Sequence, residues 1–109
     1  MPGPEMNGGI EMAIMQVSVI PVGTGSASLG DLVAETIRVP KKHGVKFELN
    51  AMGTNLEGDL DALLKIAREM HEAPFRKGAP RVVTTIHIDD RRDKELTMEH
   101  KVRSVLERL

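Results

Sequence analysis

The sequence predicts an α+β sandwich in which four strands form one antiparallel sheet and two helices cover one of its faces. Apolar and polar residues alternate, as in half-buried strands, over three segments: 13–20, 45–51 and 82–89. Apolar residues recur every three to four positions, as in amphipathic helices, over two others: 29–42 and 60–71. With a short third strand inside 52–58, the order along the chain is strand, helix, strand, strand, helix, strand.

The first strand and the loop that follows it form the most distinctive local pattern. We expect the strand 13–20 to end at Pro21, and Ser28 to cap the helix 29–42. The Gly-, Thr- and Ser-rich loop 21–28 would leave free N–H groups at a helix N-terminus, which suits a small polar or anionic ligand. A helix entry that merely satisfies its own caps explains the loop equally well. Within the helix, Pro40 predicts a kink or an early end.

The middle of the chain predicts a hairpin followed by a second helix. In 45–51 the apolar residues face inward: Val45, Phe47, Leu49 and Ala51. After a turn at Gly53, Thr54 and Leu56 point to one face of the third strand while Asn55 and Glu57 point to the other. Asp59 caps the helix 60–71.

The last part of the chain predicts the strand 82–89, a charged turn and a final helix, 97–109. That helix carries a narrow apolar stripe: Met98, Val102, Val105, Leu106 and Leu109. The stripe suits packing against a neighbouring subunit or against the helical layer of the same chain.

Two right-handed crossovers over one antiparallel sheet make the predicted fold ferredoxin-like. Both crossover helices cover the same face, so the opposite face is left open. On the expected alternation this open face is polar with few charges: Gln16, Ser18, Glu48, Asn50, Thr85 and His87, with Ile14, Ile20 and Val83 among them. Such a surface suits another protein sheet or a small ligand.

The amino-acid composition argues against several classes of binding partner. A chain of 109 residues forms one domain, 12–109, behind a flexible N-terminal extension, 1–11. Fifteen basic against sixteen acidic residues, and only two aromatic ones, argue against nucleic acid. Apolar runs far short of the ~20 residues of a transmembrane helix argue against a membrane protein. The chain has no cysteine, which is compatible with the cytoplasm, our expected location.

No catalytic, cofactor or metal motif stands out, so we expect neither an enzyme nor a cofactor. The pattern Gly23-x-Gly25-x-x-Ser28 lacks the third glycine of a dinucleotide site, and the four histidines lack metal spacing. An acylphosphatase-like enzyme would need a catalytic Arg and Asn near the first loop, which has neither.

Two polar segments remain candidates for binding. Thr54 to Glu57 offers a hydroxyl, an amide and a carboxylate that could meet an aminopyrimidine, although a solvated edge-strand carboxylate is the simpler explanation. In the turn 89–94, Arg91 or Arg92 could bind a carboxylate or phosphate, although local pairing of the charges is simpler.

Three segments together resemble the small thiamine-binding protein family: 17–25, 52–58 and 81–94. The resemblance covers residues 12–109. It implies a ferredoxin-like fold whose sheets pair into dimers, commonly joined as tetramers, and binding of thiamine or its hydroxymethylpyrimidine part without catalysis. The residues that the resemblance assigns to the ligand are Ser18, Pro21, Thr54, Glu57, Asp89 and Arg91. The alternative is a structural or regulatory oligomerisation module without such a ligand.

Overall fold

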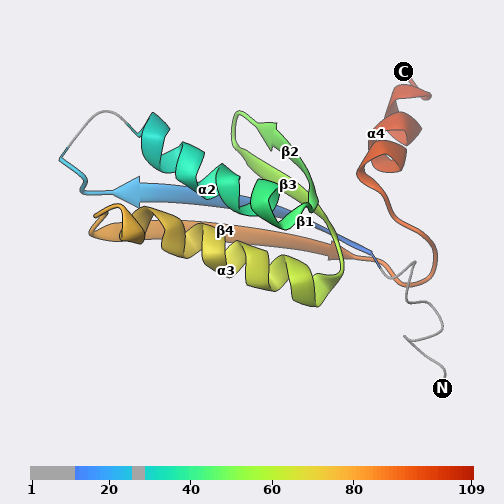
Figure 1. Cartoon of the computed structure of the whole chain (residues 1–109). Helices are drawn as coiled ribbons and strands as arrows, with labels where there is room; N and C mark the ends of the chain where they lie inside the picture. Colours follow the sequence, from blue (N-terminus) through green and yellow to red (C-terminus); the bar gives the residue numbers. More distant parts are fainter. Residues whose placement is uncertain (1–11, 26–28) are drawn as a thin grey trace.

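The four strands form one antiparallel sheet in the order β2–β3–β1–β4. The computed structural model describes residues 12–25 and 29–109. Its elements are β1 (Ala13–Val22), α2 (Gly30–His43), β2 (Lys46–Asn50), β3 (Gly53–Gly58), α3 (Leu60–Arg76), β4 (Arg81–Asp90) and α4 (Met98–Leu106). Helices α2 and α3 lie side by side on one face of the sheet (Figure 1). The predicted α+β fold is confirmed.

The hydrophobic core lies between this face and the two helices. The sheet contributes Met15, Val17 and Leu56, and α3 contributes Leu63 and Met70, all almost fully buried. The predicted cap of α3 is also present: the Ala62 N–H donates to the Asp59 carboxylate over 3.0 Å.

The two flanks of β1 differ in length. On one side β4 pairs with β1 along its whole length, from Ala13–Asp90 to Val22–Arg81. On the other side β3 pairs with β1 only from Ala13 to Val17. The sheet therefore has a four-strand end, where β1 residues 13–17 have neighbours on both sides, and a two-strand end, where β1 residues 18–22 pair with β4 alone.

The expected end of the first strand at Pro21 is wrong, because β1 continues to Val22 with Pro21 in register with Val82. A Cβ atom added to Gly53 would lie 3.0 Å from the Val17 carbonyl oxygen, so this oxygen is on the β3 side of β1. Alternate residues of a strand direct their backbone groups to the same side. The nitrogen of Pro21 therefore faces the unpaired flank, where the missing N–H removes no hydrogen bond of the sheet.

Both long helices contain a proline near their C-terminus, and neither helix ends at it. Pro40 is buried within α2, which continues to His43 and ends at Gly44 with φ of 71°. Pro74 lies within α3, which extends to Arg76 rather than to residue 71. Each proline lies close to the C-terminus of its helix, so it interrupts only the last turns. Ser28 lies outside the described residues; the N-cap position of α2 is Leu29, which makes no side-chain cap.

The hairpin tip differs from the prediction as well. Leu49, expected to face inward, is 60% exposed, and Ala51 forms the turn with Met52. The reason is a groove that separates Leu49 from α2, so that no helix packs over the tip of the hairpin.

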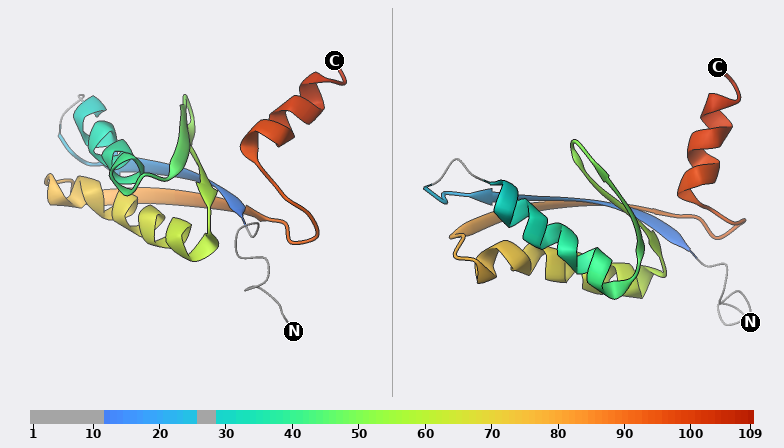
Figure 2. Two further views of the ribbon diagram at one scale, coloured as in Figure 1. Left: turned by 45° about the vertical axis from the view of Figure 1, so that its right-hand side comes forward. Right: turned by 45° about the horizontal axis from the view of Figure 1, so that its top comes forward.

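Helix α4 is shorter than expected and stands away from the sheet and from the other two helices (Figure 2). Leu96 and Met98 are buried at its start. The rest of its apolar stripe is exposed: Val102, Val105, Leu106 and Leu109. The stripe therefore does not pack against the helical layer of the same chain, and its packing against a neighbouring subunit remains a prediction.

Candidate functional site

An uncharged cleft lies at the two-strand end of the sheet, where β3 has ended and the flank of β1 is unpaired. Its volume is about 260 Å³, close to the lower limit of roughly 300 Å³ for small-molecule sites. We call it the edge cleft. Its lining comes from β1, α2, the β2–β3 hairpin and α3: residues 17–20, Val33, Thr36, Ile37, residues 49–54 and Met70.

Two hydroxyl residues, Ser18 and Thr54, line the edge cleft from opposite faces of the sheet. Thr54 is in register with the core residue Val17, whereas Ser18 is in register with Thr85 on the open face. Ser18 is half-buried, and Thr54 is only 2% exposed. Within residues 12–25 and 29–109, neither side chain makes a hydrogen bond. Among the described residues no fully buried side-chain oxygen or nitrogen lacks a partner, so the Thr54 hydroxyl keeps access to the cleft. It is therefore available to a ligand that lies between α2 and the hairpin.

The backbone adds further polar groups to the cleft. The Val17 carbonyl oxygen lies on the β3 side of β1, and Val19, two residues on, points the same way. The N–H and C=O of Val19 thus face the unpaired flank, and Val19 lines the cleft. The walls are apolar, with α2 on one side and the hairpin on the other. This combination suits a flat, neutral ring that carries both hydrogen-bond donors and acceptors.

The structure brings together two of the six predicted site residues. Ser18 and Thr54 line the edge cleft. Pro21 is buried farther along β1 and does not line it. Glu57 and Asp89 lie at the four-strand end, each paired in register with the first residues of β1, and Arg91 follows the end of β4.

Glu57 contacts the start of α4 rather than the edge cleft. Its Oε1 atom accepts a hydrogen bond of 2.6 Å from the Met98 N–H, and its side chain is 7% exposed. The Lys46 ammonium lies 3.7 Å from Glu57 Oε2 and also forms an ion pair with Glu99. The hydrogen bond to Glu99, aided by the charge of Glu57, raises the pKa of Lys46. Glu57 thus anchors the N-terminus of α4, where a carboxylate also stabilises the helix dipole.

The charged turn pairs locally, as its simpler interpretation predicts. Arg91 Nε lies 2.6 Å from Asp93, and Arg92 lies 2.8 Å from Asp90. These arginines lower the pKa of both carboxyl groups. Asp89 accepts a hydrogen bond of 2.5 Å from Lys101 of α4.

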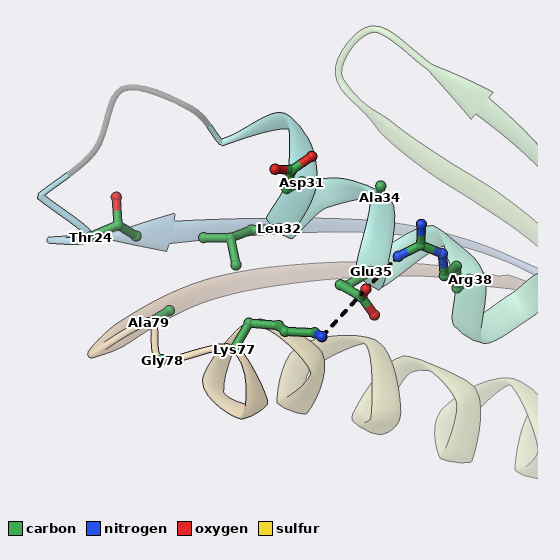
Figure 3. Close-up of a pocket in the computed structure, with 9 residues that line it drawn as sticks. All are labelled: Thr24, Asp31, Leu32, Ala34, Glu35, Arg38, Lys77, Gly78 and Ala79. Atoms are coloured by element: carbon green, nitrogen blue, oxygen red, sulfur yellow. Dashed lines mark hydrogen bonds and ion pairs between the residues drawn. The ribbon is translucent and has the colours of Figure 1, made fainter.

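A larger cavity of about 610 Å³ lies between the start of α2 and the end of α3 (Figure 3). It adjoins the predicted Gly-, Thr- and Ser-rich loop, of which residues 26–28 lie outside the described part. Both cations in its lining, Arg38 and Lys77, pair with Glu35, and Asp31 occupies the first turn of α2. These carboxylates make the cavity a poor site for an anion, and the predicted loop ligand remains a prediction.

Sequence reasoning missed most of the cleft walls. Asn50 and Met52 belong to the hairpin, whose tip was expected to pack inward. Val33 and Ile37 carried a usable signal, because they are adjacent on one side of a predicted helix.

Among the described residues there is no cluster of acidic and histidine side chains that could hold a metal ion. Nor is any of the described helices long and apolar enough to cross a membrane.

Fold and site together define a small α+β domain with a cleft suited to a small ring compound. A family model described as thiamine-binding protein matches residues 15–106, and the chain belongs to this family. Its relatives include the UPF0045 protein YqgV of Bacillus subtilis, which is 43% identical over 98 residues. That alignment covers 86% of this chain and 94% of the relative.

Solved structures support the same assignment. The structure of protein MJ1052 from Methanocaldococcus jannaschii has a TM-score of 0.81 and 44% identity, covering 89% of this chain and 98% of that one. A Thermotoga maritima protein, linked by its name to thiamine biosynthesis or salvage, has a TM-score of 0.73. At 21% identity, over 86% of this chain and 98% of the other, it shows a shared fold alone.

Proposed function

We propose that this protein is a non-catalytic binding protein for thiamine, and that the edge cleft holds the pyrimidine part of the ligand. The observation that carries the proposal is an uncharged cleft with apolar walls, into which the Thr54 hydroxyl faces without a hydrogen bond to any described residue. Membership of the thiamine-binding family supports the choice of ligand.

The chemistry of an aminopyrimidine matches the cleft. Its amino group donates and its ring nitrogens accept, so each can pair with the Thr54 hydroxyl or with the backbone of Val19. The faces of the ring would contact apolar side chains, among them Ile37 and Met70. No charged side chain among the described residues lines the cleft, so nothing there complements the cationic thiazolium of thiamine. We therefore place the pyrimidine inside and the thiazolium toward solvent.

A binding role without catalysis also fits the cleft. Catalysis by a hydroxyl requires an adjacent general base. Among the described residues of the lining there is no His, Asp, Glu, Lys or Cys to act as one. Pro21, Glu57, Asp89 and Arg91 remain predictions as ligand contacts, and the cytoplasm remains the predicted location.

Isothermal titration with thiamine tests the proposal, followed by hydroxymethylpyrimidine, thiamine phosphates and an unrelated pyrimidine. Thr54→Val keeps the shape of the side chain, removes the hydroxyl and should weaken binding of thiamine and of hydroxymethylpyrimidine about tenfold. Ser18→Ala, which removes a hydroxyl on the open face, should weaken it less. Ser104→Ala, which removes a hydroxyl from α4, is the matched control and should bind as the wild type does.

Wild-type affinity of the Thr54→Val variant would remove the edge cleft from the proposal. A correctly folded protein that gives no saturable heat with any of these compounds would reject ligand binding altogether. It would favour the oligomerisation module instead, for which the exposed stripe of α4 is the supporting observation.

A further inference from the structure

The edge cleft adjoins a second space, the groove between α2 and the β2–β3 hairpin, which we call the outer groove. Val33, Ile37 and Leu49 line both the edge cleft and the outer groove, so the two spaces meet along these side chains. The volume of the groove is about 400 Å³, larger than the 260 Å³ of the edge cleft. A ligand whose ring fills the cleft therefore has room to extend into the groove.

The outer groove differs from the edge cleft in charge. The rest of its lining comes from α2: Gly30, Ala34, Arg38 and Lys41. Among the described residues, the edge cleft has no charged side chain, whereas the groove has two cations and no carboxylate. Arg38 forms an ion pair with Glu35, but Glu35 does not line the groove. Such a lining favours the anionic part of a ligand.

Lys41 is the cation that is available to an anion. Its side chain is exposed, and within residues 12–25 and 29–109 it makes no hydrogen bond or ion pair. By contrast, its neighbours Lys42 and His43 both pair with Glu69 of α3. A basic residue in the last turn of a helix also stabilises the helix dipole. The test must therefore separate this structural role of Lys41 from ligand binding.

We propose that the outer groove holds the phosphate of a phosphorylated aminopyrimidine ligand, so that the protein prefers thiamine monophosphate to thiamine. This inference rests on the proposed function and names the ligand class for the same site. A phosphate monoester carries a charge of about −1.5 to −2 at pH 7. Thiamine alone brings only its cationic thiazolium toward Lys41 and Arg38, which repel it. The phosphate reverses the sign of this interaction.

The spacing along α2 lets one ligand reach both spaces. Ile37 and Lys41 are four positions apart, so they lie on the same side of the helix. Their separation along the helix axis is roughly 6 Å at 1.5 Å per residue. Ile37 and Leu49 line the boundary of the two spaces. The pyrimidine would lie on the cleft side of this boundary and the phosphate on the groove side, one helical turn away.

Isothermal titration of the full chain with thiamine and with thiamine monophosphate tests the inference. The readout is the ratio of the two dissociation constants, which a change in stability or in the helix dipole alone does not move. At low ionic strength the monophosphate should bind about fivefold more tightly, as two exposed ion pairs would give. Higher salt should reduce this ratio, because it screens exposed charges.

Substitutions of Lys41 locate the phosphate. Lys41→Gln should reduce the preference for the monophosphate to about twofold or less, and Lys41→Glu should make thiamine the tighter ligand. Because Lys41 is exposed and makes no contact with a described partner, both variants should fold normally, which circular dichroism checks. Lys65→Gln makes the same change at an exposed position of α3 outside the cleft and the groove. It is the matched control and should keep the wild-type ratio.

Equal affinities of the wild-type protein for thiamine and its monophosphate would overturn the inference and leave the proposed function standing. A preference for the monophosphate that persists in Lys41→Glu would also overturn it, because the phosphate would then lie outside the outer groove. If neither compound binds to the folded protein, the proposed function is rejected, and this inference is rejected with it.

Discussion

The two ends of the sheet differ in how deeply their side chains are buried and in the polar groups that they expose. At the four-strand end, Met15 and Leu56 are in register and fully buried, and Glu57 anchors α4 by a buried hydrogen bond. At the two-strand end, Val19 is only partly buried, and the Thr54 hydroxyl, which bonds to none of the described residues, lines a cleft. The sheet is therefore most stable where all four strands are present. It offers polar groups to a ligand where one neighbour is missing.

The largest expected difference between the two ends concerns two leucines of one hairpin. Leu56→Ala removes a side chain with 0% exposure and should lower the free energy of unfolding by about 2–5 kcal/mol. Leu49→Ala, 60% exposed near the hairpin tip, should change it by no more than about 0.5 kcal/mol. Urea denaturation measures both. Similar losses in the free energy of unfolding for the two variants would show that the tip is packed in solution. The two ends of the sheet would then not differ in stability.

The anchoring of α4 at the four-strand end gives the next largest effect. Glu57→Ala leaves the buried Met98 N–H without a partner, at a cost of about 1–3 kcal/mol. Hydrogen exchange should become faster over residues 97–106 and stay unchanged in α3. Glu48→Ala, on the neighbouring strand, is the control. Unchanged protection of α4 in the Glu57→Ala variant would show that Leu96 and Met98 alone hold the helix.

A glycine at the boundary between the two ends gives a smaller effect. In Gly53→Ala the new Cβ atom meets the Val17 carbonyl oxygen at 3.0 Å, so the hairpin must shift away from β1. We expect a loss of about 1 kcal/mol in the free energy of unfolding and weaker thiamine binding, because the hairpin is a wall of the cleft. Gly30→Ala at the start of α2, where a Cβ meets nothing within 4 Å, should do neither. If the Gly53→Ala variant binds thiamine with wild-type affinity, ligand binding does not depend on the position of the hairpin.

The smallest effect is a pH dependence in the helical layer. Hydrogen bonds from His43 and then Lys42 lower the pKa of Glu69 below its ordinary value of 4.5. The stabilisation is therefore fully present above pH 4.5 and is lost as the pH falls through the lowered pKa. Because the carboxylate is partly exposed, the loss should stay below about 1 kcal/mol. Glu69→Gln should flatten the stability curve in this acid range, and an unchanged slope there would contradict the assignment.

Much of the fold was predictable because strand alternation and helix spacing are local signals. They placed Gln16, Ser18, Thr85 and His87 on one face, and the register confirms it. The prediction that Pro21 ends the first strand was wrong, and Pro40 does not end its helix early. Proline is costly only where its missing N–H would have been bonded. Which side of a strand lacks a neighbour is a property of the whole sheet and leaves no local signal.

The candidate site was predictable only in part. Thr54 was a candidate from its own chemistry and from the family resemblance, and Ser18 from the resemblance alone. Both line the cleft, although their side chains lie on opposite faces of the sheet. The partner of Glu57 was hidden from sequence reasoning, because Met98 is 41 positions away and contributes only its backbone. Contacts of that kind depend on where the last helix is placed in three dimensions.

Pro21 affects the tendency of the protein to aggregate at high concentration. An unpaired strand flank is the usual starting point of sheet-to-sheet aggregation. Along the unpaired flank of β1, the ring nitrogen of Pro21 interrupts the row of donors that an invading strand would need. Only a short stretch around Val19 offers both a donor and an acceptor. The same open flank is therefore long enough for a small ring and too short for a foreign strand.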